Sequence, residues 1–246
     1  MSEPPHLSIV VPAYNEAQRL PPTLAKLEQF FREFTRSFEV LIVVEHSADA
    51  TLEIATAFAR QQANFHAIDN GPQRGKGCAV RSGILRASGQ HVFYMDADLS
   101  VPPDEILPFM EAFDAHPEID VLFGNRQHSG SRIVRRQSRL RENLGKTFNR
   151  ILQLHGLAPT HDTQCGFKAF RRAAAQAIFS RQKLDGFAFD VEVLLLAERL
   201  GFKVADLPVQ WMNSADSRVR LIRDSLAMLR DTLRVKRLVG DTLRSR

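Results

Sequence analysis

Short apolar runs alternate with amphipathic stretches along this chain, and this alternation limits the possible folds more than any other feature. The runs are too short for helices and are bounded by glycine or polar residues, so they indicate buried strands. The stretches between them carry apolar residues at helical spacing, as at Leu24, Leu27 and Phe31. Regular alternation of strand and helix predicts an α/β fold with a mostly parallel sheet flanked by helices. The predicted strands are 7–13, 38–44, 65–68, 91–95, 120–124 and 203–211, with Pro208 marking an edge or bulge in the last.

Two aspartates, Asp96 and Asp98, directly follow the predicted strand 91–95. The carboxyl ends of parallel strands form the ligand-binding edge of an open α/β sheet. Carboxylate oxygens at that edge suit Mg²⁺ or Mn²⁺ bridging a diphosphate. An ordinary turn is the alternative, because aspartate is common in turns.

The motif Arg74–Gly77 comes directly before another predicted helix. Glycines and a lysine at the start of a helix can present backbone N–H groups to phosphate, although this motif is not a Walker A sequence. We therefore expect Lys76 to contribute to a nucleotide site. A flexible connection between strand and helix is the competing interpretation.

The net charge of +5 and a pI near 9.5 favour an anionic partner, which can be a phosphorylated substrate, nucleic acid or a membrane surface. Eight basic residues and one acid lie between residues 126 and 150, where the apolar spacing over 140–152 predicts a helix. A second basic concentration runs from Arg218 to Arg237. Aromatic residues do not interleave these bases, so we do not expect nucleic acid as the partner.

No apolar run approaches the roughly 18–20 residues that a membrane span requires, and the start of the chain lacks the pattern of a secretion signal. We expect a cytoplasmic protein with peripheral contact at the inner face of the membrane. A single domain is predicted over residues 1–216, followed by a basic amphipathic helix and tail over 217–246. That helix would either pack on the domain or lie in a membrane interface, and the sequence leaves both open. Its apolar stripe is Ile222, Leu226, Leu229 and Leu233.

Six motifs, taken together and in this order, resemble the family 2 inverting glycosyltransferases, in the branch of the dolichyl- and polyprenyl-phosphate glucosyl- and mannosyltransferases. The resemblance covers residues 7 to 220. It implies the GT-A fold, which is Rossmann-like. It also implies transfer of a hexose, glucose from UDP-glucose, to a polyprenyl or dolichyl phosphate, with Mg²⁺ or Mn²⁺ as cofactor. The motifs are Val10–Glu16, Arg74–Gly77, Asp96–Ser100, Gly124–Arg126, Asp162–Lys168 and Phe187–Glu192.

The same resemblance implies roles for individual residues. Asp96 and Asp98 would hold the diphosphate and the metal. Arg126 lies where the family places an arginine near the acceptor phosphate, Arg141 where a second is expected, and Arg218 where related enzymes carry a basic residue. The residues that would line the nucleotide site are Pro12, Ala13, Tyr14, Asn15 and Glu16.

The chain departs from the family pattern after its second predicted strand. Val44, Glu45 and His46 stand where the family usually has Asp-Asp-Gly. The acid that helps to bind the nucleotide base is therefore replaced or moved to Glu45. The sequence consequently leaves the identity of the donor base open, and a non-catalytic nucleotide-sugar binder is one alternative.

The chemistry of transfer depends on the acceptor. A phosphate acceptor is already anionic near neutral pH and needs no general base, and arginines such as Arg126 and Arg141 would hold it. A soluble hydroxyl acceptor would need a carboxylate base, for which Asp190 is the candidate. Asp190 could equally cap the helix predicted to end at Leu200. Asp162 and Gln164 would orient the acceptor or brace the site.

Overall fold

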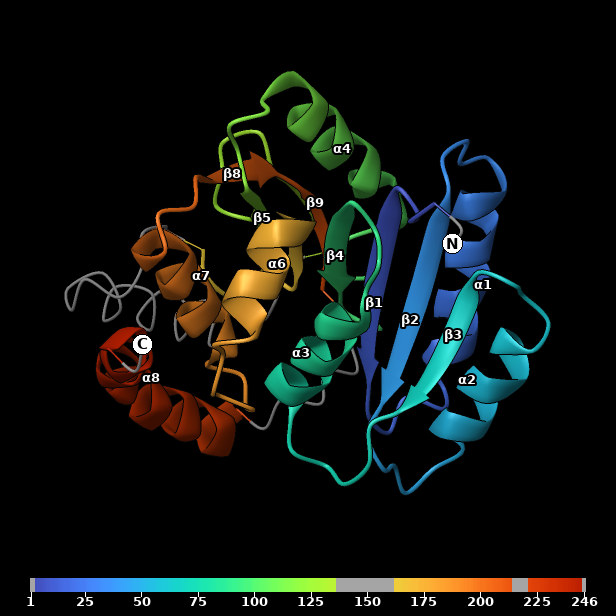
Figure 1. Ribbon diagram of the computed structural model, residues 1–246. Coiled ribbons are helices and arrows are strands. Elements are labelled where there is room, and N and C mark those ends of the chain that lie inside the picture. The colour runs from blue at the N-terminus through green and yellow to red at the C-terminus, as the bar shows by residue number, and fades with distance from the viewer. Residues whose placement is uncertain (1–2, 136–161, 214–220, 245–246) are drawn as a thin grey trace.

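The computed structural model describes residues 3–135, 162–213 and 221–244, and these form an α/β fold around a seven-stranded sheet (Figure 1). The strand order is β3-β2-β1-β4-β7-β5-β8. All neighbouring strands run parallel except β7, which runs antiparallel to both β4 and β5. The strands are β1 (Leu7–Ala13), β2 (Phe38–Val44), β3 (Phe65–Asp69), β4 (His91–Met95), β5 (Val121–Asn125), β7 (Phe167–Arg171) and β8 (Val204–Pro208).

Helices cover both faces of this sheet. One face packs against α1, α2 and α4, and the other against α3, α6 and α7. In β1, Ile9 and Val11 pack with the helices on the first face and Val10 with those on the second, so the strand carries apolar side chains on both sides, as expected when both faces are covered. The helices are α1 (Leu20–Arg32), α2 (Thr51–Ala59), α3 (Lys76–Arg86), α4 (Ile106–Ala115) after the short 3₁₀ helix η1 (Pro103–Glu105), α6 (Arg172–Phe179) and α7 (Phe189–Arg199).

The mostly parallel sheet is confirmed, but the strand predicted over 203–211 divides in two. β8 ends at Pro208, which has no N–H to continue the ladder. The next residue, Val209, donates its backbone N–H to Ser131 Oγ at 3.0 Å. β9 (Gln210–Met212) then leaves the main sheet and pairs with β6 (Arg132–Arg135) in a separate two-stranded sheet, the β6–β9 ribbon.

Strand β7 was not predicted from the sequence, because it is short and carries a lysine, Lys168, in its interior. Its position is nevertheless central, since it bridges β4 and β5. The amino end of an antiparallel strand lies beside the carboxyl end of its neighbour. Register pairs Met95 with Phe167, so the stretch that enters β7 meets the aspartates that follow β4.

The C-terminal helix α8 (Leu221–Arg244) packs on α7. Val235 and Val239 are buried in the same cluster as α7, whereas Lys236 and Arg237 are exposed. This part of the helix therefore packs on the domain, which is one of the two positions that the sequence left open. Several predictions lie outside the described residues: the side chains of Ile222, Leu226, Leu229 and Leu233, the helix over 140–152, and the boundary at residues 216 and 217.

Within the described residues, none of the helices combines the length and apolar character that crossing a membrane requires.

His91, at the amino end of β4, makes stability depend on pH. Its ring is buried against Phe113, with ring centroids 4.9 Å apart, and burial and the neighbouring His6 lower its pKa to about 4. As pH falls below about 6.5, His91 becomes protonated in the unfolded chain but stays neutral in the folded protein. The stability that this neutral histidine allows above pH 6.5 is therefore lost between about pH 6.5 and pH 4. We expect the free energy of unfolding, measured by urea titration, to fall by about 1–2 kcal/mol from pH 7 to pH 5 through this residue.

The substitution His91→Gln should remove much of that pH dependence. His66→Gln is the matched control, because His66 is exposed on β3. An identical pH dependence in all three proteins would contradict the assignment to His91.

Candidate active site

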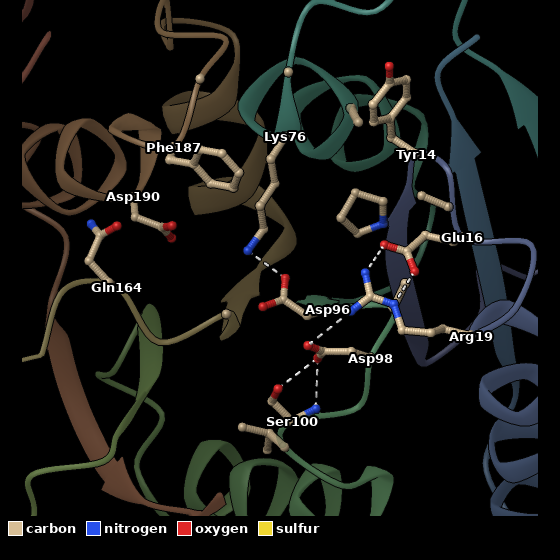
Figure 2. Close-up of a pocket in the computed structure, with 18 of the residues that line it drawn as sticks. Tyr14, Glu16, Arg19, Lys76, Asp96, Asp98, Ser100, Gln164, Phe187 and Asp190 are labelled. Atoms are coloured by element: carbon tan, nitrogen blue, oxygen red, sulfur yellow. Dashed lines mark hydrogen bonds and ion pairs between the residues drawn. The ribbon is translucent and has the colours of Figure 1, made fainter. Parts of the chain in front are cut away.

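A cavity of about 430 Å³ lies at the carboxyl edge of β1, β2 and β4, and the starts of α3 and α7 also contribute to its wall (Figure 2). It brings together most of the residues that the sequence singled out. Those that line it are Pro12, Ala13, Tyr14, Glu16, Glu45, Lys76, Asp96, Asp98, Arg126, Gln164 and Asp190. Of the remaining predicted residues, Asn15 and Asp162 do not line the cavity, and Arg141 and Arg218 lie outside the described residues.

The two aspartates after β4 have different partners. Lys76 Nζ lies 2.5 Å from Asp96 Oδ1, as Figure 2 shows. Asp98 Oδ1 accepts hydrogen bonds from the backbone N–H and the hydroxyl of Ser100, at 3.0 and 2.7 Å. Burial, and then the like charge of Asp96, raise the pKa of Asp98. Burial opposes the charge on Lys76, but Asp96 and other carboxylates still raise the pKa of Lys76.

This donor set fits a divalent cation. Two carboxylates of like charge lie close together, and the raised pKa of Asp98 reflects that repulsion as well as burial. The described residues contain no group of three or more His, Cys, Asp or Glu placed to hold a metal ion. Mg²⁺ is commonly held by one or two carboxylates together with substrate phosphates, so the pair suits a metal that arrives with a diphosphate.

Gly166 makes room for Asp96. A Cβ on Gly166 would lie 2.0 Å from Asp96 Oδ2. Gly166 immediately precedes β7, and the pairing of β7 with β4 brings it here. The glycine in the motif Asp162–Lys168 is thus explained by the close approach of the carboxylate to the backbone.

Replacing Gly166 with alanine should displace Asp96 and break its ion pair with Lys76. We expect donor turnover, measured as release of nucleoside diphosphate, to fall by about 100-fold, the scale for removing one charge-stabilising group. Gly240→Ala in α8 is the control, since a Cβ there meets nothing within 4 Å. The assignment would be refuted by a Gly166→Ala enzyme that turns over like the control.

The loop after β1 is fixed by residues that follow β2. Asn15 has φ of +54°, a left-handed conformation that asparagine tolerates. Its backbone N–H donates to Ser47 Oγ at 3.0 Å, and its Oδ1 accepts from the Ala48 backbone N–H at 2.8 Å. Asn15 therefore shapes the loop that carries Tyr14 and Glu16 into the cavity wall.

Arg19 is a cavity residue that was not predicted from the sequence. Its guanidinium makes two hydrogen bonds to the Glu16 carboxylate, one of 2.6 Å from Nε, and its Nη1 lies 3.9 Å from Asp98 Oδ2. It thus adds positive charge between the loop after β1 and the aspartates (Figure 2). The sequence offered one signal for this contact: Arg19 follows Glu16 by three positions at the start of a predicted helix, a spacing that lets the two side chains meet.

Glu45 lies at the exit of β2, as predicted, and is 2% exposed. Its carboxylate accepts backbone N–H bonds from Arg74 and Gly75, at 3.0–3.1 Å. Burial raises the pKa of Glu45 despite these bonds. Gly75 has φ of +130°, and a Cβ there would lie 2.6 Å from the carbonyl oxygen of Asp185. The Arg74–Gly77 motif is therefore packed from both sides, which argues against a flexible connection.

Arg126, at another part of the cavity wall, forms an ion pair with the buried Asp162 behind it. Arg126 Nε and Nη2 donate to the two Asp162 oxygens at 2.8 and 2.7 Å, and the Arg126 backbone N–H donates at 2.8 Å. Burial opposes ionisation of Asp162, but Arg126 holds the pKa of this carboxyl below its ordinary value. Trp211, which the sequence did not single out, lies with its ring centroid 5.4 Å from the guanidinium carbon.

Asp190 lies in the first turn of α7 and makes no helix-cap bond. Its Oδ1 instead accepts from Lys168 Nζ at 2.6 Å and from the Tyr94 hydroxyl. Lys168 is fully buried and also donates to the carbonyl oxygens of Thr163 and Cys165, at 3.1 and 2.7 Å. Lys168 and Tyr94 were not among the predicted site residues. In the sequence, Tyr94 was marked only by its hydroxyl within the predicted strand 91–95, and Lys168 only by its place in the motif Asp162–Lys168.

The chain matches the family model described as Glycosyl transferase family 2 over residues 8–179. It therefore belongs to glycosyltransferase family 2 and is a glycosyltransferase with the GT-A fold.

Among the relatives of this chain are proteins named dolichyl-phosphate beta-glucosyltransferase. The protein from Dictyostelium discoideum is 33% identical over 94% of this chain and 74% of its own length. The protein from Drosophila melanogaster is 32% identical over 95% of this chain and 76% of its own length. Among solved structures, glucosyl-3-phosphoglycerate synthase from Mycobacterium tuberculosis, in complex with Mn²⁺, UDP-glucose and phosphoglyceric acid, matches with a TM-score of 0.70. It is 18% identical, with 96% of this chain and 80% of that chain covered, and supports the fold alone.

Proposed function

We propose that this glycosyltransferase transfers glucose, with inversion, from UDP-glucose to a polyprenyl or dolichyl phosphate. The names of the curated relatives support the donor sugar and the acceptor. The structural neighbour, which shares the fold, was solved with Mn²⁺ and UDP-glucose bound, the type of metal and the donor proposed here.

On the donor side, Asp98 and Asp96 would hold Mg²⁺ or Mn²⁺ together with the diphosphate. The metal would neutralise the negative charge that develops on the leaving diphosphate. Lys76, already paired with Asp96, would place a second positive charge beside the same phosphates. Pro12, Ala13 and Tyr14 form the part of the wall on which the nucleoside would lie.

The proposal of a phosphate acceptor rests on the partners of the carboxylates that line the cavity. Five carboxylates line the cavity in the described residues, and each already has a hydrogen-bond or ion-pair partner: Glu16 with Arg19, Glu45 with the Arg74 and Gly75 amides, Asp96 with Lys76, Asp98 with Ser100, and Asp190 with Lys168. None of the five is without a partner. A phosphate acceptor needs no base, because it is already ionised near neutral pH.

Arg126 would hold that phosphate. Its Nε and Nη2 are used by Asp162, which leaves Nη1 without a partner among the described residues. The ion pair fixes the guanidinium in one orientation and so prepares it for a charged ligand. The Trp211 ring lies within cation–π distance of the same guanidinium, with its centroid 5.4 Å from the guanidinium carbon.

A soluble hydroxyl acceptor is the second candidate, because Asp190 lines the cavity and its Oδ2 makes no bond within the described part of the chain. Asp190→Asn separates the two. Loss of a general base should lower turnover by about 10²–10⁴-fold. With a phosphate acceptor, the amide oxygen can still accept from Lys168, and turnover should fall by less than about tenfold.

The direct test is release of nucleoside diphosphate from UDP-glucose or GDP-mannose, with Mg²⁺ or Mn²⁺, and with or without a short polyprenyl phosphate. Release that requires UDP-glucose, metal and lipid phosphate together is the expected result. Release driven by a soluble alcohol in place of the lipid phosphate would refute the proposed acceptor.

A further inference from the structure

The β6–β9 ribbon carries exposed apolar side chains. Val134 is 49% exposed and Met212 is 43% exposed, and they are two of the four exposed large hydrophobic residues in the described part of the chain. Register pairs Ile133 with Trp211 and Arg135 with Met212, so Val134 is the bulged residue beside Met212. Apolar residues exposed singly are ordinary, whereas neighbours on one small ribbon indicate a contact surface.

The same ribbon carries unpaired positive charge. Arg132 and Arg135 are exposed, and neither guanidinium has an ion-pair partner within the described residues. The acid that contacts the ribbon is Glu105, whose Oε1 accepts the backbone N–H of Gln210 at 3.1 Å. Exposed apolar residues combined with unpaired arginines suit the interface of an anionic lipid surface.

The ribbon also reaches the active site. Trp211, between the exposed Gln210 and Met212, is buried, lines the cavity and makes a cation–π contact with Arg126. The backbone N–H of Met212 donates to the carbonyl oxygen of Ser100 at 2.8 Å, directly beside the hydroxyl that binds Asp98. One side of the ribbon therefore belongs to the cavity wall while the other faces solvent.

We propose that the β6–β9 ribbon docks the enzyme on an anionic lipid surface and so brings a membrane-embedded lipid phosphate to Arg126. This inference rests on the proposed function, because a polyprenyl-phosphate acceptor has a tail that must remain in lipid while its phosphate enters the cavity. The arginines attract the anionic headgroups, and Val134 and Met212 enter the interface between them. The ribbon thereby fixes which edge of the protein faces the membrane.

Vesicle sedimentation tests the docking surface, using phosphatidylcholine vesicles with and without phosphatidylserine. The double variant Arg132→Gln/Arg135→Gln should bind the anionic vesicles roughly 25-fold more weakly, since each arginine near an anionic leaflet contributes about fivefold. Val134→Ser/Met212→Ser should weaken binding by about tenfold. The matched control is Leu85→Ser/Leu107→Ser, which changes the other two exposed hydrophobic residues and should bind like the wild type.

Activity separates docking from chemistry. Both ribbon variants should use a long-chain polyprenyl phosphate in vesicles poorly, yet turn over a short, detergent-free polyprenyl phosphate at the wild-type rate. Ribbon variants that bind anionic vesicles as the wild type does would overturn the inference, as would equal weakening in the Leu85/Leu107 control. A wild-type enzyme inactive with both acceptors would instead refute the proposed function, while the sedimentation result would still decide whether the ribbon docks.

Discussion

Asp98→Ala is expected to lower the turnover of UDP-glucose by about 1,000-fold, the upper range for removing one group that stabilises developing charge. Asp98 is the carboxylate of the pair that has no lysine partner, and it lies beside Asp96 in the cavity wall. Its pKa is raised by burial and by Asp96, so its charge does not stabilise the fold. The free energy of unfolding should therefore fall by no more than about 2 kcal/mol, the value of the two hydrogen bonds lost to Ser100. Nucleoside diphosphate release and urea unfolding measure the two quantities.

Ser100→Ala is the matched control for Asp98. It removes the hydroxyl that bonds to Asp98 Oδ1 but keeps the carboxylate and the backbone N–H bond. We expect a loss of about tenfold in turnover. An Asp98→Ala enzyme that remains within tenfold of the wild type would exclude Asp98 as the principal ligand of the metal and diphosphate.

Arg126→Ala is expected to have two effects, one on the acceptor and one on stability. It removes the guanidinium proposed to hold the acceptor phosphate, so kcat/KM for the acceptor should fall by about 100-fold or more while donor binding is unchanged. It also leaves Asp162, which is 0% exposed, with the backbone N–H of residue 126 but without the guanidinium that balances its charge. Breaking a buried ion pair from one side costs about 3–5 kcal/mol of unfolding free energy at neutral pH.

The double variant Arg126→Ala/Asp162→Asn separates these effects. Removing the uncompensated charge should restore much of the stability, because the buried carboxylate is then absent. Acceptor use should not recover, since the guanidinium is still missing. Recovery of acceptor kcat/KM together with stability would mean that Arg126 acts only by holding Asp162 in place.

The parallel part of the sheet could be predicted from the sequence because its strands are apolar, short and separated by helices of ordinary spacing. Asp96 and Asp98 could be placed at the carboxyl edge for the same reason, since that edge follows from strand direction alone. Strand β7 could not be found in this way. Its pattern contains the buried Lys168, whose charge is stabilised by Asp190 and by the carbonyl groups of Thr163 and Cys165.

The sequence also could not predict which charged residues pair with one another in the cavity. Arg19, Lys168 and Trp211 contribute to the site only through contacts with residues that other elements position. Glu45 was expected near the nucleotide base, and the structure shows that its oxygens also hold the loop of Arg74 and Gly75. Such contacts depend on how side chains from different elements meet. The spacing of residues along a single element does not predict this.

The position of β7 between β4 and β5 has a consequence for how specificity can change in this fold. β4 leads to Asp96 and Asp98, β5 leads to Arg126, and β7 joins the two strands through continuous main-chain hydrogen bonds. The distance between the proposed donor and acceptor sites is thus fixed by the interior of the sheet and not by its loops. Substitutions in the surrounding loops can therefore alter which donor or which acceptor is bound, while the distance over which the sugar is transferred stays the same.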